Sequence, residues 1–123
     1  MSTGESAPVR VVHLRDGDRR VLASDAERAE GLLAKVRGLM FRRSLPAGYG
    51  LVFPFEDAKT RNIHMLFVAI PLDVLWLVED EVTRVERLRP WLGFGHSIAD
   101  TVVELPAGAA EGVEAGDTVQ ILE

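Results

Sequence analysis

A single aspartate interrupts an otherwise apolar run in this chain. Asp73 lies within the segment 68–78, where every other side chain is apolar. An ionised carboxylate is costly to bury unless a cation or hydrogen-bond donors meet it. We therefore expect Asp73 either to be paired at the end of a strand or to line a polar site within the fold.

Basic residues elsewhere in the chain are candidate partners for this carboxylate. An arginine can hold a carboxylate through two hydrogen bonds, and a carboxylate can fix one tautomer of a histidine. We group Arg37, Arg42, His64 and Asp73 as a candidate ligand-binding site, in which an arginine binds an anionic group and Asp73 orients His64. The competing interpretation is a structural ion pair between a helix terminus and the sheet, the commoner fate of a buried acid.

Other chemistries receive weaker support from the residue pattern. A hydrolytic triad could draw on Ser44 or Ser97 with His64 or His96, but the chain has no Gly-x-Ser-x-Gly turn. The three histidines include no ligand-spaced pair such as His-x-x-x-His, so no metal site is expected. No cofactor is expected either.

Two further motifs leave alternatives open. Paired carboxylates for glycoside hydrolysis would need Asp73 with Glu104 or Asp57, and spacing along the chain does not test that distance. The segment 90–96 holds Trp91 and Phe94 among glycines but lacks the lysine of a phosphate-binding loop. Its aromatic residues could form a mobile lid over a cleft, although fixing the loop to the core is the more ordinary role.

Length, charge and composition restrict the class of protein. With 123 residues the chain fits one domain, which we place at 9–123 after a disordered tail at 1–8. A net charge of −5 disfavours a nucleic-acid partner, and the absence of cysteine excludes disulfides and thiol catalysis. No apolar stretch is long enough to span a membrane and the first residues lack a secretory signal, so we expect a cytoplasmic protein with no membrane partner.

One amphipathic helix is predicted to position the arginines. Ser24 and Glu27 form a capping box, apolar residues recur at helical spacing over 25–37, and Gly38 suits a left-handed stop. Period-2 alternation and turn residues predict short strands elsewhere, at 9–14, 20–23, 50–53, 62–68, 72–78, 82–88, 101–105 and 118–122. The expected fold is α+β, a compact, mostly antiparallel sheet or small barrel with one amphipathic helix packed on it.

Six ordered blocks of this chain resemble the family called domain of unknown function 192. They are Arg37-Gly38-Leu39-Met40-Phe41-Arg42, Gly50-Leu51-Val52-Phe53, Ile63-His64-Met65, Ile70-Pro71-Leu72-Asp73-Val74, Val102-Val103-Glu104-Leu105-Pro106-Ala107-Gly108 and Gly112-Val113-Glu114-Ala115-Gly116-Asp117. The resemblance implies a compact β-rich domain with a helix, which occurs both alone and in exported prokaryotic proteins and has no established activity. Where the family usually has an aromatic residue before the methionine, this chain has His64, and Phe67 stands near a position where a polar residue is common.

Three functions follow as hypotheses. The first is a binding module whose polar cleft takes a small anionic ligand or a carboxylate-bearing peptide, with the partner protein unknown. The second is a hydrolase that uses Asp73 and His64 as acid–base groups. The third is a protein-interaction module whose surface, rather than a cleft, carries the function.

Overall fold

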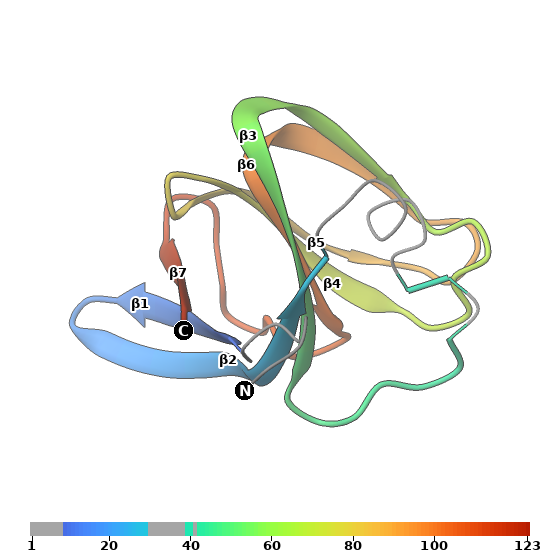
Figure 1. Ribbon diagram of the computed structural model, residues 1–123, viewed down its shortest axis with the longest axis horizontal. Helices are drawn as coiled ribbons and strands as arrows, with labels where there is room; N and C mark the ends of the chain where they lie inside the picture. Colours follow the sequence, from blue (N-terminus) through green and yellow to red (C-terminus); the bar gives the residue numbers. More distant parts are fainter. Residues whose placement is uncertain (1–8, 30–38, 41) are drawn as a thin grey trace, which may run out of the picture.

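The computed structural model describes residues 9–29, 39–40 and 42–123, and seven strands make up its regular structure (Figure 1). The strands are β1 (Val9–Arg15), β2 (Asp18–Arg28), β3 (Tyr49–His64), β4 (Leu72–Val78), β5 (Glu81–Leu88), β6 (Phe94–Pro106) and β7 (Thr118–Leu122). The predicted tail at 1–8 lies outside the described residues. Within the described residues, no helix is long and apolar enough to cross a membrane.

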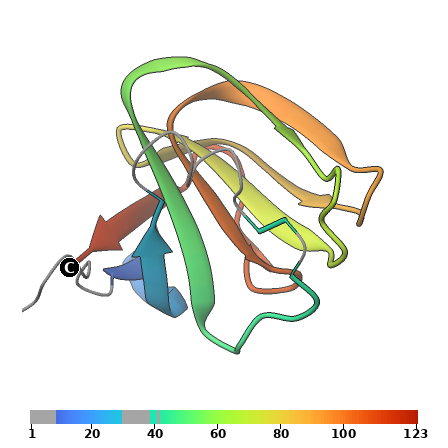
Figure 2. The same ribbon diagram turned by 45° about the vertical axis from the view of Figure 1, so that its right-hand side comes forward.

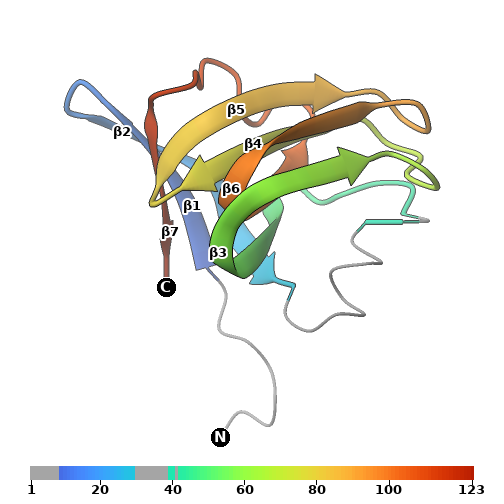
Figure 3. The same ribbon diagram turned by 90° about the horizontal axis from the view of Figure 1, so that it is seen from above.

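The seven strands form a closed barrel in the order β1-β2-β3-β6-β4-β5-β7. All neighbouring strands are antiparallel except β2 and β3, which run parallel over four residue pairs. The ring closes where Glu81 of β5 pairs with Thr118 of β7. Viewed from above, β3 and β6 arch across the molecule while β1, β2 and β7 gather at one side (Figure 3).

The expected α+β class is wrong, because the described part of the chain is all β and contains no helix that packs on the barrel. The first residues of the predicted helix, Asp25 to Arg28, belong to β2 and pair with Tyr49 to Val52 of β3. The rest of that prediction, residues 30–37, and Gly38 lie outside the described residues. At 25–28, pairing with a strand distant in sequence overrides the capping signal, a local preference worth about 1 kcal/mol.

Strands β3 and β6 are each longer than predicted. The strand expected at 50–53 continues through Pro54 and takes in the first three residues of the one expected at 62–68, while β6 extends the one expected at 101–105. Their pairing breaks register between Pro54 and Lys59, where the ribbon bends. Beyond the bend, residues 59–64 of β3 pair with residues 94–99 of β6, and we call this part the outer ribbon. Its curvature is clear when the molecule is turned (Figure 2).

Two apolar clusters stabilise the fold. The first fills the barrel with side chains from all seven strands, including Leu75, Leu77 and Leu105. The second lies on the opposite face of β4 and contains Trp76, Met65 and other residues of β3, β4 and β6. Because successive strand residues alternate between faces, β4 is buried on both sides and reads as a continuous apolar run.

Trp76 joins the outer ribbon to the barrel. Its side chain is fully buried, and its indole Nε1 donates a 2.9 Å hydrogen bond to the carbonyl of Arg61. Gly95 passes so close that a Cβ there would lie 2.8 Å from the Trp76 ring. Gly95, which was predicted to lie in a loop, therefore allows β6 to pack closely against Trp76.

Candidate functional site

Asp73 is a structural centre of the barrel. The residue is 3% exposed, and its Oδ1 accepts a 2.8 Å hydrogen bond from Arg87 Nε on the adjacent strand. Its Oδ2 accepts from the main-chain nitrogens of Gly108 and Ala110, at 2.9 and 3.0 Å. The expectation that this carboxylate would be buried and met by a cation is confirmed, and among the described residues that cation is Arg87, not Arg42 or His64.

His64 does not share the environment of Asp73. Asp73 pairs with Leu105 and lies on the same face of β4 as Leu75, and both leucines belong to the barrel interior. His64 is exposed, whereas its neighbour Met65 is buried in the second cluster. The described hydrogen-bond partners of Asp73 are Arg87, Gly108 and Ala110, and His64 is not among them.

The two arginines of the predicted site have separate outcomes. Arg42 is exposed, and its guanidinium lies 5.4 Å from the centre of the Tyr49 ring, within range of a cation–π contact. Arg37 lies outside the described residues. The ligand-binding role of Arg37, Arg42, His64 and Asp73 stays a prediction.

The alternative carboxylate pair is also separated. Leu105 is the partner of Asp73 in β6, so the preceding residue, Glu104, points to the other face of the sheet. Among the residues that the structure describes, no three histidine or acidic side chains converge as metal ligands would.

Two loops form a rigid edge of the molecule. The β3–β4 and β5–β6 loops lie side by side, to the right in Figure 1. Main-chain hydrogen bonds join them, from Trp91 N to Val68 O at 3.0 Å and from Met65 N to Gly93 O at 2.9 Å. Such bonds restrain the backbone of both loops.

Large apolar side chains are exposed on these loops and at the start of β6. We call this group the aromatic end; it comprises Leu66, Phe67, Trp91, Leu92 and Phe94. Trp91 and Phe94 are 51% and 56% exposed, so they do not fix the loop to the core as the sequence favoured. An exposed apolar group of this size usually marks an interaction surface.

The backbone of the aromatic end is strained. Phe67 and Trp91 have φ angles of 64° and 66°, and their rings meet edge to face at 6.1 Å. The other non-glycine residues with positive φ are Asp16, Glu79 and Asp80, which lie at hairpin turns that favour this conformation. Bulky aromatic residues rarely adopt it, and such outliers concentrate at functional positions.

The outer ribbon continues this surface with a row of exposed residues. His64 pairs with Phe94, Asn62 with His96, and Thr60 with Ile98, and all six are exposed. The rings of Phe94 and His96 lie 5.9 Å apart. Two titratable imidazoles therefore border the aromatic end.

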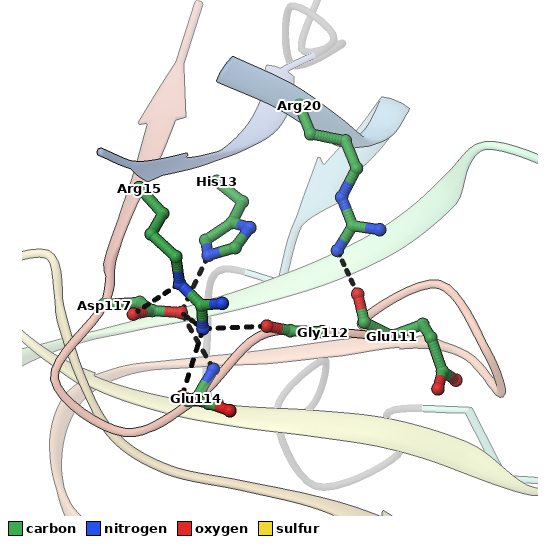
Figure 4. A network of polar contacts seen from close by, with 7 residues as sticks. All are labelled: His13, Arg15, Arg20, Glu111, Gly112, Glu114 and Asp117. Atoms are coloured by element: carbon green, nitrogen blue, oxygen red, sulfur yellow. Dashed lines mark hydrogen bonds and ion pairs between the residues drawn. The ribbon is translucent and has the colours of Figure 1, made fainter. Parts of the chain in front are cut away.

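A second polar region joins the β1–β2 hairpin to the loop before β7 (Figure 4). Asp117 accepts hydrogen bonds from His13 Nε2 at 2.8 Å and from Arg15 Nη2 at 2.6 Å. Arg15 also donates to the Gly112 carbonyl, and Arg20 to the Glu111 carbonyl. Chiefly through the Arg15 hydrogen bond, the pKa of Asp117 is held well below its usual range.

An open hollow of about 280 Å³ accompanies this network. Side chains of both charge signs line it. The lining residues are His13, Arg15, Asp16, Asp18, Arg20, Glu111 and Gly112. Because Arg15 is already bonded to Asp117 and Arg20 to a carbonyl, we interpret the network as a structural link between the β1–β2 hairpin and the loop before β7.

Glu104 is the titratable group that the sequence interpretation undervalued. It is 7% exposed on β6, and burial raises its pKa to about 7. The signal was present, since Glu104 interrupts an apolar run at 102–105 just as Asp73 interrupts 68–78. In the sequence, Glu104 is a candidate only as the partner of Asp73 in a carboxylate pair.

Comparisons with known proteins identify the family. A profile of DUF192, described as an uncharacterized ACR, matches residues 12–121. The chain belongs to the domain of unknown function 192 family. The resemblance seen in the sequence is thereby confirmed, and the family's own description assigns no activity.

Relatives and solved structures agree with this assignment. UPF0127 proteins of Thermococcus gammatolerans and Thermococcus sibiricus are 31% and 32% identical, over 81% and 74% of this chain and 68% and 62% of their own lengths. A crystal structure of a candidate transcription regulator from Sinorhizobium meliloti matches with a TM-score of 0.83 and 26% identity, over 98% of each chain. A protein of unknown function from Novosphingobium aromaticivorans matches with a TM-score of 0.75 and 25% identity, over 90% of this chain and 83% of its own.

Proposed function

We propose that this member of the domain of unknown function 192 family is a binding module. Its ligand is a segment of a partner protein that carries apolar anchor residues flanked by carboxylates. The observation that supports this most is the aromatic end, where two interlocked loops expose five large apolar side chains.

Preorganisation favours binding at this surface. The cross-loop hydrogen bonds and the ring contact between Phe67 and Trp91 fix the side chains before a partner arrives. A surface that is already ordered loses less conformational entropy on association. Rigid aromatic residues are also the residue type that most often dominates binding energy at interfaces.

Charge favours an acidic partner segment. The chain has 19 acidic residues, yet none falls within residues 62–72 or 87–99, which carry the aromatic end and its flanks. Arg87 in this range is already paired with Asp73, so the basic side chains there with no ion pair to a described residue are Arg89, His64 and His96. Such complementarity raises the association rate and selects against basic partners.

The carboxylate-bearing peptide of the first hypothesis remains the ligand, but its binding site is the aromatic end and not a cleft around Asp73. His64 stays in the site, at the rim of the aromatic end, whereas Asp73 holds the barrel together through Arg87. The acid–base pair that a hydrolase would need, Asp73 with His64, receives no support from this geometry. A small anion bound near Arg42 stays a prediction.

The test is a binding titration with a short synthetic peptide of leucine and glutamate residues, compared with a matched peptide of leucine and lysine. Binding is followed by the fluorescence of a dye attached to each peptide, so that the signal does not depend on Trp91. We expect the glutamate peptide to bind, and Trp91→Ser to weaken it by at least about tenfold, a change of about 1.4 kcal/mol. Val21→Ser is the matched control, since Val21 is 45% exposed on β2, outside the aromatic end, and its loss should leave the affinity unchanged.

Charge-reversal variants test independently whether the surface prefers an acidic peptide. Arg89→Glu should weaken the glutamate peptide and strengthen the lysine peptide, while Arg10→Glu on β1 should change neither. Equal binding of both peptides, or equal weakening by Val21→Ser and Trp91→Ser, would contradict the proposal. Tighter binding of a single-stranded oligonucleotide than of either peptide would assign the same surface to nucleic acid instead.

A further inference from the structure

Glu104 occupies the centre of a row of residues that crosses the sheet. Its neighbours in the row are Leu51 on β3 and Val74 on β4, and Glu86 on β5 follows Val74. Leu51 and Val74 belong to the second apolar cluster, so the carboxylate stands between hydrocarbon side chains. These apolar neighbours explain why burial raises the pKa of Glu104.

The carboxylate has no partner within the described part of the chain. No hydrogen bond or ion pair joins it to any described residue, in contrast to Asp73, which accepts three hydrogen bonds. Nevertheless, no described side-chain oxygen or nitrogen is both sealed from solvent and unbonded. The Glu104 oxygens are therefore not completely sealed from solvent.

Two described polar side chains of this region have partners of their own. Tyr49 precedes Leu51 by two residues on the same face, and its hydroxyl donates a 2.9 Å hydrogen bond to Glu27. Arg42 lies over the Tyr49 ring. Burial and the Glu27 hydrogen bond raise the pKa of Tyr49 to about 12, so the phenol keeps its proton and presents an uncharged aromatic ring to the site.

We propose that Glu104 is a binding site for an alkylammonium group. A buried, unpaired carboxylate is stabilised by a cation that brings its own hydrogen-bond donors, and the apolar walls suit the hydrocarbon part of an amine. A metal ion would need further ligands, and the described residues supply no such cluster. The ammonium can belong to a free amine or to a lysine side chain. This site is separate from the aromatic end and does not depend on the function proposed there.

The test is a titration of the whole chain with n-butylammonium chloride at pH 8, followed by NMR of the methyl groups of Leu51 and Val74. We expect a saturable shift that n-butanol does not produce and that Glu104→Gln abolishes. Glu86→Gln is the matched control, because Glu86 lies in the same row but is ion-paired with Arg84. Below pH 7 the affinity should fall by up to tenfold per pH unit, since the proton competes for the carboxylate.

Several results would overturn the inference. These are no saturable shift at pH 8, an equal shift with n-butanol, an equal shift in Glu104→Gln, or an affinity that does not change between pH 5 and pH 8. The comparison with n-butanol and the measurements at different pH use the unsubstituted chain. They therefore test the ammonium site even if Glu104→Gln folds poorly. A parallel titration with N-acetyl-lysine amide separates the two sources: equal or tighter binding indicates a protein lysine, and weaker binding indicates a free amine.

Discussion

At the scale of single residues, two carboxylates in apolar runs have opposite fates. Asp73 is bonded on both oxygens, by Arg87 and by two main-chain nitrogens, so it contributes to stability. Glu104 is as deeply placed but has no partner in the described chain, so it costs stability when ionised. Retention of such a costly group is a property of functional residues.

Replacement of Asp73 tests its structural role. Asp73→Asn removes the charge from three hydrogen bonds, and we expect the free energy of unfolding to fall by about 2–3 kcal/mol. Asp57→Asn is the control, because Asp57 forms exposed ion pairs with Lys59 and Arg61 and should cost less than about 1 kcal/mol. Chemical denaturation measures both, and an unchanged midpoint for Asp73→Asn would show that the carboxylate is retained for another purpose.

At the scale of elements, the outer ribbon distinguishes this fold from a plain barrel. The bend between Pro54 and Lys59 carries the ends of β3 and β6 over the second cluster. This arrangement brings the β3–β4 and β5–β6 loops together and so creates the aromatic end. The candidate binding surface therefore depends on close packing at Trp76.

Substitution of Gly95 tests that dependence. Gly95→Ala places a methyl group within 2.8 Å of the fully buried Trp76 ring, and overpacking of this kind costs about 1–3 kcal/mol. We expect a lower melting temperature and altered Trp76 fluorescence. His96→Ala, on the exposed face of the same strand, should change the melting temperature little. Equal melting temperatures for wild type and Gly95→Ala would show that the ribbon yields easily.

At the scale of the whole molecule, stability should depend on pH in two opposite ways. The folded pKa of Glu104 is raised from 4.5 to about 7, so its favourable contribution is complete below pH 4.5 and is lost as the pH rises through 7. The folded pKa of Asp117 is lowered, so its contribution is complete above its ordinary pKa and is lost as the pH falls.

We therefore expect the free energy of unfolding to be greatest near pH 5. It should decline by roughly 3 kcal/mol toward pH 8, the equivalent of the Glu104 shift, and decline again in acid. Denaturation curves between pH 2 and pH 9 measure this profile. Glu104→Gln should remove most of the alkaline decline, and Asp117→Asn most of the acid decline. A wild-type profile that is flat from pH 5 to pH 8 would contradict the unpaired state of Glu104.

The sequence determined much of this protein by local rules. Alternation and turn residues located β1, β5 and β7 almost to the residue, and the continuous apolar run located β4. The apolar run around Asp73 correctly required a buried, paired carboxylate. These features depend on a few neighbouring residues, so spacing and residue type suffice to predict them.

Only the tertiary structure decided the remainder. The segment 25–28 carries a helix signal, but its partner is a strand more than 20 residues away, and that pairing is not encoded locally. The cation of Asp73 depends on the register between β4 and β5, and the unpaired state of Glu104 depends on which face of β6 is covered. The aromatic end joins two loops through hydrogen bonds between residues far apart in the chain. Long-range register and the choice of buried face arise from the packing of the whole chain, which residue spacing does not express.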